Sequence, residues 1–295
     1  MWDYRWIYLM LLPCMAFFII FKYVPMYGIQ LAFKDYVIKG IAASPWNNFE
    51  HFKYMMTEPE FLPALRNTLI ISFYRILFGF PFPILLAIMI NEVYMPRYKR
   101  VLQTIYTFPH FLTWVVMAGI LKNMFASNGV INQLLTVWGM ESVSPLLSLT
   151  GFRPFIWFSN IWKEAGWDTI IYMAALAGID PGLYEAAEID GANRWRKIWH
   201  ITLPGIRSTI LIMLILEIGR IMTTGASFDQ VFNLYSSPVY EVADTIDTYI
   251  YRTSFGGTKN FGYTTAVGLS KSVIGVLMML GANRLVTACG EDGLF

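Results

Sequence analysis

The sequence predicts an all-α membrane protein that crosses the bilayer several times. Of its 295 residues, 56% are hydrophobic, 17% are aromatic and only 14% are charged. A soluble domain carries about 25% charged residues, so this composition is typical of a chain that exposes its surface to lipid. The apolar residues also fall into six long runs, which are the second observation behind this fold class.

Each apolar run is long enough to cross the membrane as a helix. The hydrocarbon core is roughly 30 Å thick, so a spanning helix needs about 20 residues. The predicted spans are Trp6–Tyr27, Thr68–Ile90, Val101–Leu121, Pro154–Gly178, Pro204–Thr224 and Tyr263–Thr287. The first is longer than the apolar part of a signal peptide and no small-residue cleavage site follows it, so we expect it to be retained.

The distribution of Lys and Arg predicts the orientation, because cytoplasmic loops keep the excess of these residues. The loops at 91–100 and 180–204 each carry three of them, whereas residues 127–150 carry none. Six alternating spans then place both termini in the cytoplasm. The segments 33–62 and 228–262 are expected outside, where they either cover helix ends or bind an external partner.

One cytoplasmic loop is unusually polar for this chain and reads EAAEIDGANRWRKIWHITLP over residues 185–204. Asp180 and Pro181 suit the N-cap and first position of a short helix. Gly191 then predicts a bend, because glycine adopts backbone angles that other residues avoid. A second short helix is expected over Arg194–Ile201. The loop should therefore be an elbow of two helices on the cytoplasmic face.

Two functions for this elbow are compatible with its residues. Ala186 and Ala187 are small, so the first helix could sit closely in a groove of another protein. Alternatively, the Trp and Arg residues of the second helix could anchor the elbow on lipid headgroups. The physical pattern leaves both open.

The spacing of the elbow resembles a known family. Its motif consists of EAA, three residues, Gly191, nine residues and then Ile201-x-Leu203-Pro204. This spacing is similar to the EAA signature of the membrane subunits of bacterial ABC importers. In that family the loop sits in a cleft of a cytoplasmic ATPase subunit. The resemblance implies that the ATPase-coupling positions are Glu185, Ala186, Ala187, Asp190, Gly191, Leu203 and Pro204.

The resemblance covers nearly the whole chain. The stretches PEFLPALRNTLIIS, FDQVFNLYSSPVYEVADTIDTYIYR and AVGLSKSVIG resemble the carbohydrate branch, including permeases for multiple sugars, lipo-oligosaccharides and polysaccharides and the membrane subunits of alginate importers. It implies a type I ABC importer permease architecture. Residues 1–62 would form the first span and an external segment, 63–288 a core of five spans with the coupling loop 180–204, and 289–295 a short cytoplasmic tail.

The resemblance also implies the function and the partners. The chain would import an oligo- or polysaccharide, alginate or another acidic sugar polymer, through a bacterial inner membrane by alternating access. A homologous second permease, two ATPase subunits that bind ATP and magnesium, and an external binding protein would complete the transporter. The membrane lipid surrounds the spans.

Other function classes find little in the sequence. No G-x-x-x-x-G-K-[ST] loop is present, so ATP is expected to bind a partner. His51, His110 and His200 fall in separate regions, and neither H-E-x-x-H nor C-x-x-C occurs, so we expect no metal site, catalytic set or cofactor in this chain. A net charge of +2 without a basic stripe argues against nucleic acid. A membrane enzyme is therefore disfavoured.

Several ionisable residues lie inside the predicted spans, where they are costly and usually face a protein interior or an aqueous cavity. The candidate pathway residues are Arg75, Lys163, Glu164, Asp168, Glu217, Arg220 and Lys271. They either pair with one another or form a weakly cationic funnel for a polyanionic sugar. Their carboxylates also keep open the alternative of a secondary transporter driven by an ion gradient.

Overall fold

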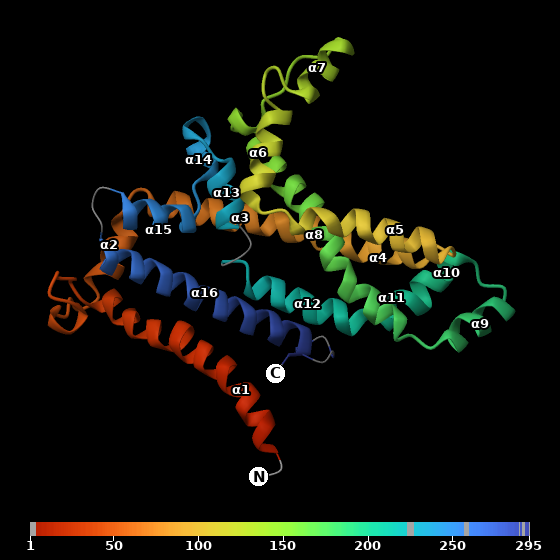
Figure 1. The fold of residues 1–295 in the computed structure, drawn as a ribbon, viewed down its shortest axis with the longest axis horizontal. Helices are drawn as coiled ribbons and strands as arrows, with labels where there is room; N and C mark the ends of the chain where they lie inside the picture. The colour runs from red at the N-terminus through yellow and green to blue at the C-terminus, as the bar shows by residue number, and fades with distance from the viewer. Residues whose placement is uncertain (1–3, 223–226, 257–259, 289, 291–292, 295) are drawn as a thin grey trace. The chain divides into compact units, whose positions relative to one another are not determined.

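The computed structural model describes residues 4–222, 227–256, 260–288, 290 and 293–294. Over these residues the regular structure is helical (Figure 1), apart from an isolated β-bridge between Lys34 and Trp46. The chain divides into two compact units, Met1–Leu62 with Tyr249–Lys271 and Pro63–Thr248 with Ser272–Phe295. The predicted all-α class is confirmed for the described residues. The end of the predicted fifth span at Thr224 and most of the predicted tail lie outside them.

The first unit begins with α1 (Arg5–Phe18), which continues as the π-helical turn η2 (Ile19–Tyr23) and the 3-10 helix η3 (Val24–Phe33). Together they form a 29-residue apolar stretch, and none of its most apolar residues is buried. Such a surface needs lipid or a partner protein around it. The other elements of the unit are η4 (Ile41–Ala43), α2 (Glu50–Thr57), most of α15 (Ile246–Phe255) and the first part of α16 (Phe261–Ala288).

The second unit holds the remaining helices. In chain order they are α3 (Phe61–Gly79), α4 (Pro81–Asn91), α5 (Pro96–Thr107), η5 (Phe108–Phe111), α6 (Trp114–Met124), α7 (Val130–Val137), η6 (Pro145–Leu147), α8 (Phe152–Ala177), α9 (Pro181–Ile189), α10 (Arg194–Lys197), η7 (Ile198–Thr202), α11 (Leu203–Gly205), α12 (Arg207–Gly219), α13 (Phe228–Leu234), η8 (Ser237–Val239) and α14 (Tyr240–Ala243). The first two residues of α3 and the last part of α15 belong to the first unit, and α16 ends in the second.

Among the described residues, three helical stretches are long and apolar enough to cross a membrane without a break, namely Arg5–Phe33, Phe61–Asn91 and Phe261–Ala288. They contain the first, second and sixth predicted spans. The third prediction was wrong in one respect, because Val101–Leu121 is not a single straight helix: the stretches Pro96–Phe111 and Trp114–Met124 meet at 99°. Pro109 lies at this break, and Leu112 is extended. A proline removes a helical hydrogen bond and clashes with the preceding turn.

The fifth predicted span is also bent. The stretches Arg194–Gly205 and Arg207–Gly219 meet at 59°, so the long helix begins three residues after Pro204 rather than at it. The part of the chain that the structure describes then holds up to five candidate spans, if each bent pair is one crossing. The helix expected over Pro154–Gly178 is present as the 26-residue α8, but Lys163, Glu164 and Asp168 interrupt its apolar character.

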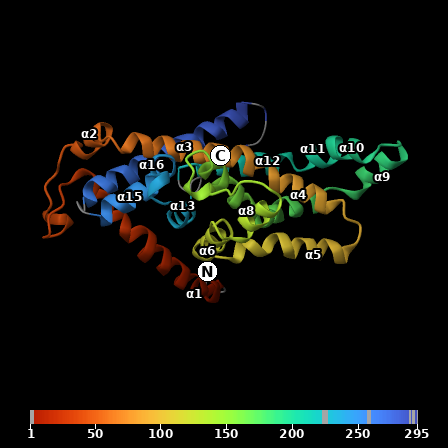
Figure 2. The same cartoon turned by 90° about the horizontal axis from the view of Figure 1, so that it is seen from above.

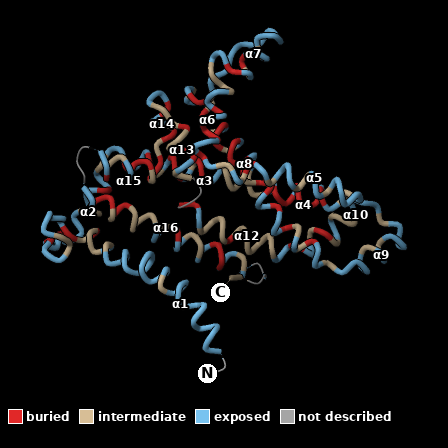
Figure 3. The backbone as a smooth tube through the Cα atoms, in the orientation of Figure 1, coloured by how far each residue is buried: buried red, intermediate tan, exposed pale blue. Residues whose placement is uncertain are grey.

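The core of the second unit is built around α8. Figure 3 shows the buried positions concentrated along α8, α6 and α13, whereas α1 of the first unit is exposed along its length. One apolar cluster joins Phe152, Phe155 and Ile156 of α8 to the buried face of α6, and a second joins Tyr172 and Leu176 to α4. Four polar residues in the middle of α8 are buried as well, namely Ser159, Asn160, Lys163 and Thr169.

Gly166 of α8 is required by packing. A Cβ atom there would overlap the backbone carbonyl of Tyr106 at the end of α5, and backbone cannot move aside as a side chain can. We expect Gly166→Ala to destabilise the protein by about 1–3 kcal/mol. Gly119→Ala in α6 is the matched control, because a Cβ there meets nothing within 4 Å. Thermal unfolding in detergent should show a lower Tm for the first variant and an unchanged or higher Tm for the second.

Candidate functional site

The polar loop 180–204 folds as the predicted elbow. Its first limb is α9, which starts where the Asp180 carboxylate accepts a 2.9 Å hydrogen bond from the amide of Gly182. Pro181 occupies the first helical position, where a missing N–H costs nothing. The start of this limb is therefore fixed by two neighbouring residues, as the sequence predicted.

Gly191 ends the first limb in a left-handed conformation with φ +74°. Its amide donates to the carbonyl of Glu188 at 3.0 Å, and the amide of Ala192 donates to the carbonyl of Ala187 at 2.9 Å. These two bonds form a Schellman cap, which satisfies the last helical carbonyls and requires a positive φ at the residue in the Gly191 position. The predicted bend is confirmed, and its geometry depends on glycine.

The second limb, α10 and η7, folds back along the first. Asn193 caps it by accepting from the amide of Arg196 at 2.9 Å. Lys197 Nζ lies 2.7 Å from Glu188 Oε1 and joins the two limbs. This hydrogen bond lowers the pKa of the Glu188 carboxyl and raises the pKa of the Lys197 ammonium. The Tyr184 hydroxyl adds a second link, 3.0 Å from the Thr202 hydroxyl.

The elbow presents its predicted coupling residues outward. Glu185, Ala186, Asp190 and Gly191 are exposed, and Ala187 is half-buried. Apolar side chains on the same elbow are equally uncovered. The exposed fraction is 88% for Ile189, 53% for Leu183 and 71% for Trp195. Exposed apolar residues on a rigid, capped helix are typical of a surface that a partner covers.

The elbow lies at the same end of the second unit as the turn between α4 and α5, in both views of the molecule (Figures 1 and 2). The guanidinium of Arg194 lies 5.6 Å from the ring centre of Tyr94 in that turn. Leu203 and Pro204 form α11 at the base of the elbow, where a Cβ on Gly205 would meet Ile179 Cδ1 at 2.7 Å. The two Lys- and Arg-rich loops therefore share one end, as the charge pattern predicted.

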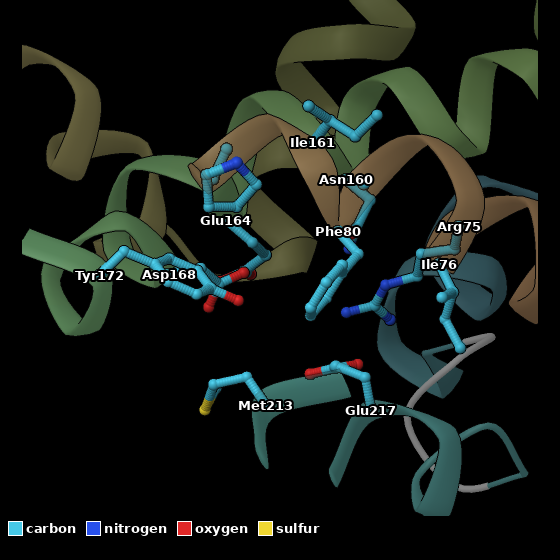
Figure 4. A pocket seen from close by; sticks show the side chains of 13 residues that line it. Arg75, Ile76, Phe80, Asn160, Ile161, Glu164, Asp168, Tyr172, Met213 and Glu217 are labelled. Atoms are coloured by element: carbon cyan, nitrogen blue, oxygen red, sulfur yellow. The ribbon is translucent and has the colours of Figure 1, made fainter. Parts of the chain in front are cut away.

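Four of the predicted pathway residues converge on one cavity of the second unit. Arg75 from α3, Glu164 and Asp168 from α8 and Glu217 from α12 line it together with Phe80, Tyr172 and other residues. Figure 4 shows the side chains of Arg75 and Glu217 pointing toward this space from facing helices. The cavity measures about 50 Å³, which is small beside the 300–1,000 Å³ of typical ligand sites.

The other predicted pathway residues are not among those that line this cavity. Lys163 is 5% exposed and points to the corner between η5 and α6 rather than into the cavity. Arg220 is exposed at the end of α12, and Lys271 belongs to the first unit. The cavity lining therefore holds three carboxylates and one guanidinium. Whether the predicted pathway residues attract a polyanionic sugar stays a prediction.

A network at the opposite end of the second unit was missed by sequence reasoning. The Asn67 amide of α3 donates to the carbonyls of Glu241 and Asp244, each at 2.9 Å. Arg153 of α8 donates at 2.7 Å to the Asn67 side-chain oxygen and at 3.1 Å to the carbonyl of Val242. This network fixes the α14 segment onto α3 and α8. The only sequence signal is a polar residue at the start of an apolar helix.

No metal centre appears among the described residues, because no group of three or more His, Cys, Asp or Glu side chains is placed to hold an ion. His110 contacts Glu164 at 2.6 Å, and His51 contacts the carbonyl of Lys34 at 3.1 Å.

Comparison with known proteins gives consistent results. Residues 79–288 match the family model described as the binding-protein-dependent transport system inner membrane component. Protein LplB of Bacillus subtilis is 45% identical over 99% of this chain and 91% of its own length. The polygalacturonan/rhamnogalacturonan transport system permease protein YteP of the same organism is 43% identical over 99% of this chain and 90% of its own length.

The fold is also similar to a solved transporter chain. In the crystal structure of a bacterial alginate ABC transporter in complex with alginate pentasaccharide-bound periplasmic protein, one chain superposes with a TM-score of 0.88. It is 41% identical, and the superposition covers 99% of this chain and 97% of that one.

Proposed function

The chain belongs to the family of inner membrane components of binding-protein-dependent transport systems, and we propose from this premise that it imports an acidic oligo- or polysaccharide. As a permease subunit it is a transport component rather than an enzyme. Two relatives support the substrate class: one is named for polygalacturonan and rhamnogalacturonan, and the other is an alginate transporter solved in complex with a periplasmic protein that binds an alginate pentasaccharide. Both are polymers that contain uronic acids, and the family favours this function over an ion-driven secondary transporter.

The observation that supports ATP-driven import is the exposed elbow. Its limbs are capped by Asp180, Asn193 and Gly191, which fix its shape, yet its apolar residues Leu183 and Ile189 are 53% and 88% exposed. A rigid helix face of this kind fits a groove in a partner. We assign that groove to an ATPase subunit, with Glu185, Ala186, Ala187, Asp190, Gly191, Leu203 and Pro204 as the coupling residues.

We further propose six spans with both termini in the cytoplasm. The three continuous spans, the two bent pairs and α8 make up this number. Although α8 carries charges, its 26 residues would extend about 39 Å, and its buried Lys163 is paired within the protein. The first span with its external segment (1–62), the core (63–288) with the coupling loop 180–204 and the cytoplasmic tail (289–295) complete the layout.

The partners follow from the same proposal. A second permease subunit would face the cavity, because about 50 Å³ in this chain is too small for a sugar. Two ATPase subunits would bind ATP and magnesium beneath the elbow, and a binding protein would deliver the saccharide to the external segments. The acidic cavity does not by itself favour a uronate, so the second permease would supply the compensating cations.

Reconstitution tests the proposal. The chain, its second permease, the ATPase subunits and the binding protein are placed in proteoliposomes with a galacturonate or alginate oligomer. Uptake is expected to need both ATP and the binding protein and to survive a protonophore. Replacing ATP by a non-hydrolysable analogue should stop it. Uptake by this chain alone that ceases when an ion gradient collapses would contradict the proposal.

A further inference from the structure

The corner between η5 and α6 is held by contacts from α8. The two arms of this broken helix meet at 99°, and Leu112 between them is extended, so no continuous helix runs through the joint. Apolar side chains of α8 pack against α6, and polar side chains of α8 contact both arms. Lys163, Glu164 and Trp167 of α8 provide such contacts.

Lys163 touches both arms of the corner. Its ammonium donates a 3.0 Å hydrogen bond to the carbonyl of His110 in η5. The same Nζ atom lies 5.5 Å from the ring centre of Trp114, the first residue of α6. Lys163 is only 5% exposed, so its charge depends on these contacts and on Glu164 Oε1 at 2.7 Å.

Glu164 also contacts the corner, and we call its contacts with His110 and Lys163, together with the contact of Lys163 with His110, the clamp. Its Oε2 atom lies 2.6 Å from His110 Nδ1, where the ring nitrogen donates to the carboxylate. The imidazole is stacked on Trp167 with ring centres 4.4 Å apart and planes within 5°. Both oxygens of Glu164 are therefore engaged at the corner, although the residue also lines the cavity. Asp168 and Glu217 are the other carboxylates that line the cavity.

We propose that Lys163 and Glu164 are positioning residues that hold the broken helix at its observed angle through His110. This proposal rests on the proposed function, because it gives Lys163 and Glu164 a role in the rate of transport and not in recognition of the saccharide. Without the clamp the corner samples other angles, so fewer transporters at any moment are in the competent conformation. The rate of uptake then falls, while the KM for the loaded binding protein stays the same.

Two substitutions of His110 separate this role from general packing. Asparagine carries a side-chain N–H near the place of Nδ1, whereas glutamine carries it near the place of Nε2. We expect His110→Asn to keep the bond to Glu164 and His110→Gln to lose it. The kcat for uptake should fall about tenfold or more in His110→Gln, as expected for one lost hydrogen bond to a charged group, and stay near wild type in His110→Asn.

A distance measurement tests the clamp without relying on transport. Spin labels are placed at Tyr98→Cys in α5 and Ile120→Cys in α6, which are 62% and 40% exposed, after replacement of Cys14 and Cys289 by Ser. The distance distribution across the corner should be narrow in the otherwise unaltered protein and in His110→Asn, and broad in His110→Gln. Glu164→Gln should broaden the distribution at least as much, because it also removes the carboxylate that pairs with Lys163. Adding His110→Gln to Glu164→Gln should then cause no further broadening.

The distance measurement and the uptake measurement test different parts of the proposal. A narrow distribution in His110→Gln, or equal broadening in His110→Asn, would overturn the clamp whatever the chain transports. An unsubstituted complex that takes up no saccharide with ATP would instead contradict the proposed function, and the distance measurement would still decide the clamp. A broad distribution in His110→Gln with unchanged kcat would reject the positioning role.

Discussion

Gly191→Val is expected to reduce ATP-driven uptake at least tenfold while the membrane helices remain folded. Gly191 has a φ of +74°, a conformation that costs an L-amino acid about 1–2 kcal/mol and a β-branched one more. The valine would move the backbone to a negative φ. The Schellman bonds from Gly191 and Ala192 would then break, and the two limbs would lose their angle.

The effect of this substitution is purely conformational. A Cβ atom at position 191 meets nothing within 4 Å, so neither crowding nor lost packing contributes. Gly191→Asn is the matched control, because asparagine tolerates the left-handed region and often replaces glycine at this cap position. Uptake and ATP hydrolysis are measured together in proteoliposomes. We expect the valine variant to lose uptake and its link to ATP hydrolysis, and the asparagine variant to retain both.

Wild-type uptake by Gly191→Val would show that the elbow does not transmit ATP hydrolysis. Equal loss in both variants would have a different meaning, because the glycine would then be needed for close contact with a partner rather than for its φ. Correct insertion is checked by unchanged expression and by an unchanged size-exclusion profile in detergent.

The elbow could be predicted from the sequence because its causes are local. Asp180, Pro181 and Gly191 each act within a few residues of their own position, and these short-range rules do not depend on the rest of the fold. The charge pattern of the loops likewise needed no tertiary information to place the elbow and the turn at Tyr94 at one end.

The broken helix and the cavity could not be predicted in this way. Pro109 marks the place of the break, but its angle is held by residues of α8 more than 50 positions later. The cavity unites Arg75, Asp168 and Glu217 only because α3, α8 and α12 pack together. The sequence likewise could not show that the Lys163 ammonium contacts the His110 carbonyl rather than lining this cavity.

The Asn67 network also could not be predicted from the sequence, because its residues are far apart in the chain. It gives the second prediction with a large expected effect. Asn67 is 3% exposed, and its partners at Glu241 and Asp244 are more than 170 residues away. Asn67→Leu would remove the hydrogen-bond partner of the Glu241 and Asp244 carbonyls and of the Arg153 guanidinium. Each buried polar group that loses its partner costs about 1–3 kcal/mol. We expect the free energy of unfolding to fall by about 3 kcal/mol or more.

Denaturation in mixed detergent micelles measures this loss. Asn233→Leu is the matched control, because Asn233 also donates to a backbone carbonyl, but to that of Asp229 one turn earlier in α13. A change of about 0.5 kcal/mol or less is expected there. Equal stability of the two variants would show that the Asn67 network does not hold the α14 segment.

Asn67→Asp distinguishes the two halves of the network. An aspartate still accepts from Arg153, and that bond becomes charge-assisted and stronger. The second oxygen, however, replaces the amide that donates to Glu241 and Asp244, so a carboxylate faces two carbonyl oxygens. If the carbonyl bonds fix the segment, Asn67→Asp should be as unstable as Asn67→Leu and should also lose stimulation of ATP hydrolysis by the loaded binding protein. If the Arg153 contact alone fixes it, Asn67→Asp should match the unsubstituted protein in both measurements.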